Sequence, residues 1–226
     1  MSHLARFLLK LKNSIAKTYK LLKILNIMHF LKKIKEILFN PEKFFLNLSK
    51  EKGVQDSLLF YVILLAFSVL MGYLFKIILG ETYTRLFYSI FNLNMPLPEY
   101  NALSLISTTI LGYIIAVALS FLLAGILYVW LIIFGGKKEY TKAYQLYIYS
   151  ETPSLLLNWI PIVSFFAWIY SFILLILGTK KIYEFSTAKS VLIYLIPLIL
   201  FGILALFLLA FAVLTLGNLN PLTKFS

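Results

Sequence analysis

The feature that most constrains this chain is its long apolar runs without a single charged residue. The longest extends from Leu103 to Phe134, and another extends from about Val191 to Leu214. About 20 apolar residues in a helix are enough to cross the hydrocarbon core of a bilayer. The chain is 61% hydrophobic, and a globule of 226 residues has too little interior to bury that much apolar surface. The sequence therefore predicts an all-α, polytopic membrane protein.

We expect five transmembrane helices within a membrane domain over residues 40–215, followed by a short external tail over 216–226. The predicted spans are about 57–79, 103–134, 143–160, 164–177 and 191–214. A polar loop is expected over 80–102. The third and fourth spans are short for a crossing. A shallow hairpin over 143–177 is therefore the alternative, and it would leave the placement of the other spans unchanged.

A basic leader over residues 1–39 precedes the membrane domain, and residues 1–56 hold twelve of the 21 Lys and Arg residues. Its apolar side chains recur at helical spacing, and this stripe changes phase near Asn26. We therefore expect two amphipathic helices with a break near Asn26, lying among anionic lipid headgroups. A leader helix packed against the protein core is the alternative. The predicted lipid-surface residues are Arg6, Lys10, Lys12, Lys17, Lys20, Lys23, Lys32, Lys33 and Lys35.

Positive charge in the loops predicts the orientation. The predicted loops 137–142 and 180–189 hold three Lys each and would lie on the same side of the membrane as the leader. The opposite side would carry Arg85 and Lys224. By the positive-inside rule we expect a cell-membrane protein with a cytoplasmic N-terminus and an external C-terminus.

Small residues recur at every fourth position of the second predicted span. They are Gly112, Ala116, Ser120 and Ala124. Such a stripe lets another helix approach closely, since lipid gives helices no hydrophobic reason to associate. The pattern predicts a helix-packing seam and not a catalytic site.

Glu151 is the one carboxylate within an apolar stretch, and Pro153 follows it closely. Carboxylates inside a membrane are costly and often functional, and a proline leaves a backbone carbonyl without its helical donor. One interpretation is a polar site in a broken helix. The other places Glu151 near the cytoplasmic headgroups, paired with Lys142.

Several function classes find no support in the sequence. Cysteine is absent and only two histidines occur, which excludes disulfides and thiolate metal ligands. No phosphate-binding glycine-rich loop, zinc-protease motif or nucleophile elbow is present. We therefore expect no enzyme activity, no catalytic residue, no cofactor, no metal and no nucleic-acid partner.

A series of short motifs follows in order along the middle of the chain. They are Asn40-Pro41, Phe44-Phe45, Gly135-Gly136, Tyr149-Ser150-Glu151-Thr152-Pro153, Trp159-Ile160-Pro161, Gly178 and Ser186-Thr187-Ala188-Lys189. Their order and spacing resemble the Yip domain family, five-span membrane proteins named for interaction with Ypt/Rab GTPases. The resemblance covers about residues 40–215. It marks a family motif or polar site at Gly135, Gly136, Tyr149, Glu151, Pro153, Pro161 and Gly178.

The resemblance implies a role in vesicle trafficking and membrane shaping. The absence of cysteine and the frequent Lys, Ile and Leu favour a prokaryotic member, for which no Rab partner would exist. We therefore expect a non-enzymatic protein that organises membrane lipids or recruits partners at the cytoplasmic face. Anionic lipids at residues 1–39 are the expected partners, and a protein partner or a homo-oligomer is left open. The alternative is a small transporter or channel that uses Glu151 beside Pro153.

Overall fold

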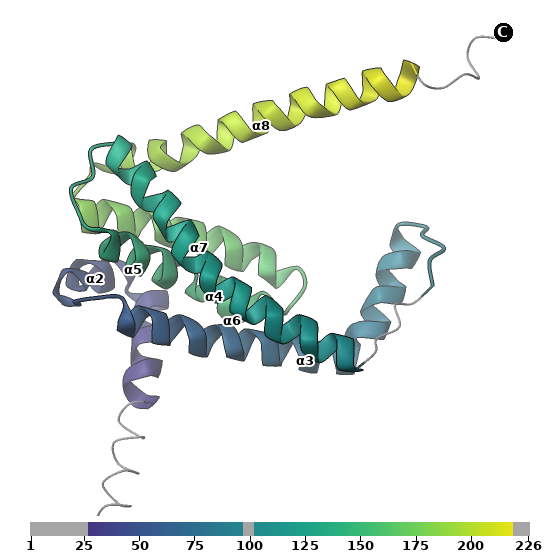
Figure 1. Cartoon of the computed structure of the whole chain (residues 1–226), viewed down its shortest axis with the longest axis horizontal. Coiled ribbons are helices and arrows are strands. Elements are labelled where there is room, and N and C mark those ends of the chain that lie inside the picture. The colour runs from purple at the N-terminus through teal and green to yellow at the C-terminus, as the bar shows by residue number, and fades with distance from the viewer. Residues whose placement is uncertain (1–26, 97–101, 219–226) are drawn as a thin grey trace, which may run out of the picture.

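A computed structural model of the chain describes residues 27–96 and 102–218, and every regular element in them is a helix (Figure 1). Residues 27–39 form the first described helical segment. The elements that follow are α2 (Pro41–Asn47), the 3-10 turn η1 (Leu48–Lys50), α3 (Gln55–Ile90), α4 (Ala102–Ile133), α5 (Tyr140–Ser150), α6 (Thr152–Leu157), α7 (Val163–Tyr183) and α8 (Thr187–Asn218). The all-α prediction is confirmed for these residues.

Four helices are long and apolar enough to cross a membrane. They are Gln55–Ile90, Leu105–Ile133, Val163–Tyr183 and Thr187–Thr215. Most of their side chains are exposed in the isolated chain, and the exposed ones are largely Leu, Ile, Val and Phe. Lipid is the solvent that such surfaces require. The chain is therefore a multi-pass membrane protein.

The predicted third span, 143–160, is not a single long helix. It consists of α5 and α6, which have 11 and 6 residues and are separated at Glu151. Neither reaches the length that a crossing needs. The structure therefore does not confirm a fifth span, and a run of apolar residues does not distinguish a lipid-facing helix from one packed inside the protein. Most of α5 is buried by its neighbours.

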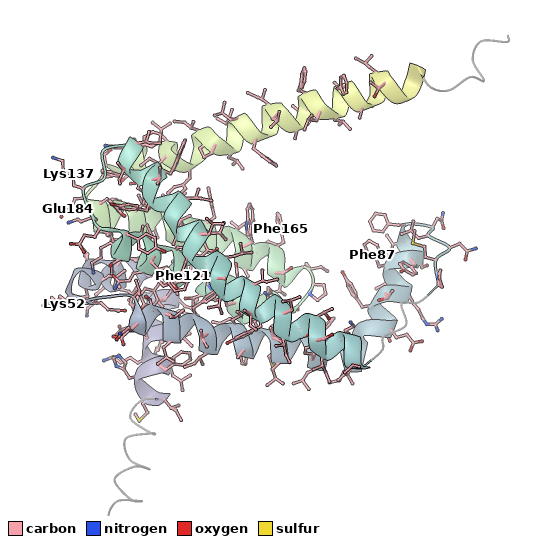
Figure 2. The ribbon with its side chains drawn as sticks, viewed as in Figure 1. Lys52, Phe87, Phe121, Lys137, Phe165 and Glu184 are labelled. Carbon is pink, nitrogen blue, oxygen red and sulfur yellow. The ribbon has the colours of Figure 1, made fainter. Side chains whose placement is uncertain are left out.

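The predicted polar loop over 80–102 is also shorter than expected, since α3 continues to Ile90. Arg85 and Glu81 form an ion pair at 2.7 Å one turn apart, and the Thr84 hydroxyl donates to the Gly80 carbonyl at 2.8 Å. Such pairs favour the helix, and no proline occurs between Gln55 and Pro96. Figure 2 shows Phe87, on this last part of α3, far from Lys52 near its start.

α3 and α4 lie side by side and antiparallel. Near the far end of α3 the Tyr73 hydroxyl donates to the Leu105 carbonyl at 3.3 Å. Closer to its start the Tyr113 hydroxyl donates to the Val62 carbonyl at 2.7 Å. Two tyrosines therefore join the helices. Each hydroxyl donates to a backbone carbonyl of the other helix, an acceptor that the hydrocarbon of the bilayer does not offer.

The segment α5–α6 turns back into α7, and the turn lies part of the way along α3. The Ser68 hydroxyl donates to the Asn158 side chain at 2.6 Å, and Trp159 lies next to Gly72. At 1.5 Å per residue, Ser68 is about 20 Å from the start of α3 at Gln55. The turn thus stops well short of the far end of α3, which continues to Ile90.

α8 is attached to the other helices only near its start. Pro197 lies inside α8, so the carbonyl of Ile193 has no helical N–H to accept. The Trp130 indole of α4 donates to that carbonyl at 2.9 Å. Tyr194 is buried and its hydroxyl hydrogen-bonds Thr179 of α7 at 2.5 Å. Beyond Pro197, α8 leaves the other helices and carries exposed apolar side chains (Figure 1).

The helical segment 27–39 packs on the protein, as the alternative reading of the leader expected. Ile37 is fully buried, and the Phe30 and Phe60 rings lie 5.1 Å apart. The Tyr170 hydroxyl of α7 donates to the Leu38 carbonyl. Part of the apolar stripe therefore faces protein and not lipid. Residues 1–26, with the predicted break near Asn26, lie outside the described residues.

Candidate functional site

The helix ends on one side of the molecule bring many of the lysines together. Figure 2 shows Lys52, Lys137 and Glu184 on the same side, opposite Phe87. They lie near the start of α3, the end of α4 and the end of α7, respectively. We call this side the basic end. The loops predicted to share one side of the membrane by their charge are thus on one side of the structure.

A buried polar cluster lies at the basic end, around Tyr149 of α5. The Tyr149 hydroxyl donates to Glu51 Oε1 and accepts from Lys33 Nζ at 2.9 Å. Lys33 Nζ also lies 3.2 Å from Glu51 Oε2. The side chains of Lys33 and Glu51 are only 15% and 16% exposed, so this ion pair is largely withdrawn from solvent. Its charges depend on each other and on Tyr149 for compensation.

Lys142 and Gln145 extend the cluster along the same face of α5. Lys142 Nζ donates to the carbonyls of Leu48 and Glu51 at 2.7 and 2.6 Å, and to the Gln145 side chain at 2.9 Å. Gln145 is fully buried, and its amide donates to the Gly53 carbonyl at 2.7 Å. Burial lowers the pKa of Lys142, while the nearby Glu51 carboxylate opposes this shift.

The sequence places this cluster by two simple devices. Lys142, Gln145 and Tyr149 are three and four residues apart, so they lie on one face of α5. Gly53 adopts a φ of +73°, a conformation that glycine takes without strain. The chain after η1 therefore turns there and offers its carbonyls to α5. Together these contacts fasten the segment before α3 to α5 by backbone and side chain alike.

We call the five residues Lys33, Glu51, Lys142, Gln145 and Tyr149 the anchor cluster.

Of the predicted lipid-surface residues, Lys33 is the one that the structure places inside the protein. Its ammonium contacts Glu51 and the face of the Tyr149 ring, at 4.9 Å from the ring centre. The helical pattern did put Lys33 opposite the apolar stripe, but it could not show that protein also covers part of that side. Lys32 and Lys35 are exposed. The six basic residues from Arg6 to Lys23 lie outside the described residues.

The predicted break beside Pro153 is present. Pro153 has no N–H for the Tyr149 carbonyl, and the Thr152 hydroxyl donates to that carbonyl at 2.7 Å. Glu151 is half-buried at the junction of α5 and α6, near Tyr61 and Tyr147. Glu151 makes no ion pair within the described residues. Lys142, its predicted partner, instead donates a hydrogen bond to the backbone carbonyl of Glu51.

The glycines of the family motif lie at close contacts. Gly135 has a φ of +81° after the end of α4, and a Cβ on Gly136 would lie 2.8 Å from the Leu131 carbonyl. A Cβ on Gly178 of α7 would overlap Leu146 and lie 2.9 Å from Phe45. Pro161 lies in the turn between α6 and α7. These residues therefore allow close approach of chain segments.

The small-residue stripe of α4 contacts different neighbours along its length. Ser120 and Ala124 are buried, and the Ser120 hydroxyl hydrogen-bonds the Tyr144 hydroxyl of α5 at 3.3 Å. The Ala116 carbonyl accepts from Tyr61 of α3 at 3.4 Å. Gly112 is exposed beside a hollow of about 350 Å³ between α3 and α4. The stripe thus packs within the chain at its buried end.

Sequence reasoning missed Glu51 and Gln145, the two members of the anchor cluster to which it gave no role. A buried glutamine at the start of an apolar helix was the available signal, since such an amide needs partners. Among the described residues no group of three or more His, Asp or Glu could hold a metal ion. The chemistry of this site is therefore that of attachment: it holds segments of the chain together at the basic end.

The fold and this site define a class: a multi-pass helical membrane protein whose N-terminal segment is anchored to its basic end. The chain belongs to the Yip1 domain family, whose family model matches residues 35–210. This family is a membrane trafficking family that is not known for enzymes. No curated protein and no solved structure matches the chain. The resemblance noted in the motifs is thus confirmed.

Proposed function

We propose that this protein is a non-enzymatic membrane organiser that uses its basic leader at the cytoplasmic face to bind anionic lipids and recruit partners. The observation that carries the proposal is the anchor cluster. It fastens residues 27–39 to the basic end, and the lysine-rich part of the leader directly precedes this segment in the sequence. Twelve of the 21 basic residues precede α3, and this concentration favours an anionic surface.

The orientation follows from the same side of the molecule. The lysines of the loops 137–142 and 180–189 lie at the basic end, together with the start of α3. The positive-inside rule then assigns the basic end, and with it the N-terminus, to the cytoplasm. Beyond Pro197, α8 points away from that side (Figure 1), which supports an external C-terminus.

A transporter at Glu151 has less support. Glu151 lines neither of the two hollows described between the helices, one between α3 and α4 and one between α4, α5, α7 and α8. No feature of the described residues therefore joins Glu151 to a path across the membrane.

The proposal predicts that the leader senses lipid charge. The chain contains no cysteine, so a single one at Leu8 of the apolar stripe can carry an environment-sensitive dye. In proteoliposomes containing anionic lipid, the dye emission should shift to the blue, and added salt should reverse the shift because it screens the attraction.

Lys52→Cys is the matched control, because Lys52 is exposed at the basic end but lies outside the leader. Its dye should respond little to lipid charge. An equal blue shift of the Leu8 dye in neutral and anionic membranes at every salt concentration would contradict the electrostatic part of the proposal.

A further inference from the structure

An apolar groove lies in the angle between α4, α7 and α8. Its volume is about 860 Å³, and its walls are almost wholly apolar. One face of α4, from Phe121 to Ile133 but without Ile132, forms one wall. Leu175 of α7 contributes to the floor, and Tyr194 and Pro197 of α8 form the other wall. The groove exists because α8 leaves the other helices after Pro197.

The contacts at Pro197 hold the groove open at a defined angle. Trp130 lines the groove and also donates to the Ile193 carbonyl that Pro197 leaves without a donor. Tyr194 is fastened to Thr179 on the other side. The two walls are thus joined near the basic end and separate away from it. The groove is therefore part of the fold and does not depend on the far half of α8.

The length of the groove matches one leaflet of a bilayer. Phe121 and Ile133 are about 18 Å apart along α4 at 1.5 Å per residue. Half of a hydrocarbon core of ~30 Å is about 15 Å. An acyl chain that starts at the basic end would therefore run along the groove to about the middle of the membrane.

The basic end of the groove carries cations without carboxylate partners. Lys189, at the start of α8, lies 4.0 Å above the Phe185 ring and next to Gly135. Lys137 is exposed two residues after Gly135. Within the described residues neither lysine forms an ion pair, whereas Lys138 pairs with Glu184.

Two tyrosine hydroxyls near the same end also have no acceptor among the described residues. Tyr128 lines the groove, and no hydrogen bond is formed by its hydroxyl. Tyr183 is buried, its hydroxyl has no hydrogen-bond partner, and it lies close enough to Tyr128 and Tyr194 to interact with them electrostatically. Buried donors are normally satisfied, so this end of the groove favours a ligand that brings acceptor oxygens.

We propose that the groove binds an acyl chain of an anionic glycerophospholipid, with its phosphate against Lys189 and Lys137 and its ester oxygens near Tyr128. A neutral alkyl chain would fill the walls but leave the lysines without a counter-charge. The α8 helix of a second copy would also leave them so, because it carries no carboxylate. The inference extends the proposed lipid role to a second site, and it does not depend on the leader.

Trp130 is a reporter built into the groove. Full-length protein with Trp159→Phe and Trp168→Phe retains Trp130 as its single tryptophan, since the chain has three. It is placed in nanodiscs that hold one copy each, with acyl-brominated phosphatidylglycerol or phosphatidylcholine at equal fractions. Brominated phosphatidylglycerol should quench Trp130 more strongly, and Lys189→Gln should lower its relative affinity about fivefold. Lys52→Gln, also at the basic end but beside α3, should leave the preference unchanged.

A second pair of variants tests the groove itself. Val129→Phe would fill the groove and should reduce quenching by both lipids, whereas Ile132→Phe lies on the same helix outside the lining and should not. Both residues are exposed, so neither change disturbs the core. Equal quenching by the two lipids, or a preference that survives Val129→Phe, would overturn the proposal. A preference found only in nanodiscs with two copies would assign the groove to a second chain.

The same measurement on a chain without residues 1–26 separates this inference from the proposed function. The groove should keep its preference there, while the lipid response of the leader is lost. Loss of the preference together with the leader would show that the leader alone attracts the lipid, and would overturn the groove site.

Discussion

Thr152 and Trp130 perform the same task at two prolines. Pro153 and Pro197 each leave the carbonyl four residues earlier without its helical donor. The Thr152 hydroxyl donates to the Tyr149 carbonyl at 2.7 Å, and the Trp130 indole donates to the Ile193 carbonyl at 2.9 Å. Lipid offers no such donors, so the protein supplies them: the Tyr149 carbonyl also accepts a backbone N–H at the end of α5. The chain breaks between α5 and α6 at the first proline, whereas α8 continues through the second.

The first of these pairs predicts the effect of a conservative substitution. Thr152→Val keeps the shape of a fully buried side chain but removes its donor, and the Tyr149 carbonyl is left without that bond. Because that carbonyl keeps a backbone N–H donor at the end of α5, we expect the free energy of unfolding to fall by about 0.5–1.5 kcal/mol, measured as a lower melting temperature in detergent.

Thr215→Val is the matched control. The Thr215 hydroxyl also donates to a carbonyl of its own helix, that of Phe211. The residue four positions after Phe211 is not a proline, so this carbonyl also has its helical N–H. Its substitution should change stability by no more than about 0.5 kcal/mol. Equal losses from the two variants would contradict the special role of Thr152.

At the scale of elements, the anchor cluster decides where the N-terminal segment lies. Lys33 precedes Tyr149 by 116 residues in the chain, and Glu51 precedes it by 98. The contacts join the helical segment 27–39 and the turn before α3 to a single face of α5. Since both charges are largely buried, removing either one leaves the other without compensation.

Reversing the charges tests this pairing. Lys33→Glu should destabilise the protein by about 3–5 kcal/mol, because it places a second carboxylate beside Glu51. The double variant Lys33→Glu with Glu51→Lys should recover a large part of that loss. Thermal unfolding and protease cleavage within residues 27–39 measure the two effects.

Lys32→Glu is the comparison for this experiment, since Lys32 is exposed and lies 3.9 Å from Glu36. An exposed pair contributes at most about 1 kcal/mol. If the double variant were no more stable than Lys33→Glu alone, the ion pair would not be what anchors the segment.

Gly178 lets α7 approach α5 and α2 closely. A Cβ there would overlap Leu146 and come within 2.9 Å of Phe45, so Gly178→Ala should cost about 1–3 kcal/mol of stability in a detergent melt. Gly202→Ala in α8 meets nothing within 4 Å and should be neutral or slightly stabilising. A neutral Gly178→Ala would show that the helices separate easily there.

These elements also show how far the sequence reaches. Apolar runs predicted the long helices correctly because lipid-facing residues must be apolar all along a span. The same signal does not resolve residues 143–160, which form the two short helices α5 and α6, with most of α5 buried in protein. The family motif located Tyr149, but its partners Lys33 and Glu51 are distant in the chain. Patterns among neighbouring residues in the sequence cannot predict such contacts, because they form only when the helices pack.

For the whole molecule, the depth of the turn between α6 and α7 in the membrane decides how many times the chain crosses. Ser68, which contacts Asn158 at the turn, is about 20 Å from the start of α3, against a hydrocarbon core of ~30 Å. This geometry favours the shallow hairpin over a complete third crossing. In that arrangement α3, α4 and α8 cross completely, while α7 is the returning arm of the hairpin and both ends of the hairpin lie at the basic end.

Cysteine accessibility in intact cells distinguishes the two topologies. An impermeant thiol reagent should label Ser89→Cys, near the far end of α3, from outside. Lys137→Cys should react only after permeabilisation. Ile162→Cys lies in the turn and is 77% exposed in the isolated chain, yet it should react much more slowly than Ser89→Cys. Labelling of Ile162→Cys from outside at the rate of Ser89→Cys would establish five crossings.

The anchor cluster also has a consequence for biogenesis. Lys33 and Glu51 leave the ribosome before α3 and α4, but Tyr149 emerges only after both of those helices. Until then the ammonium and the carboxylate have no buried site to enter, and they stay hydrated at the membrane surface. The part of the nascent chain that is made first is thus among the last to reach its final place.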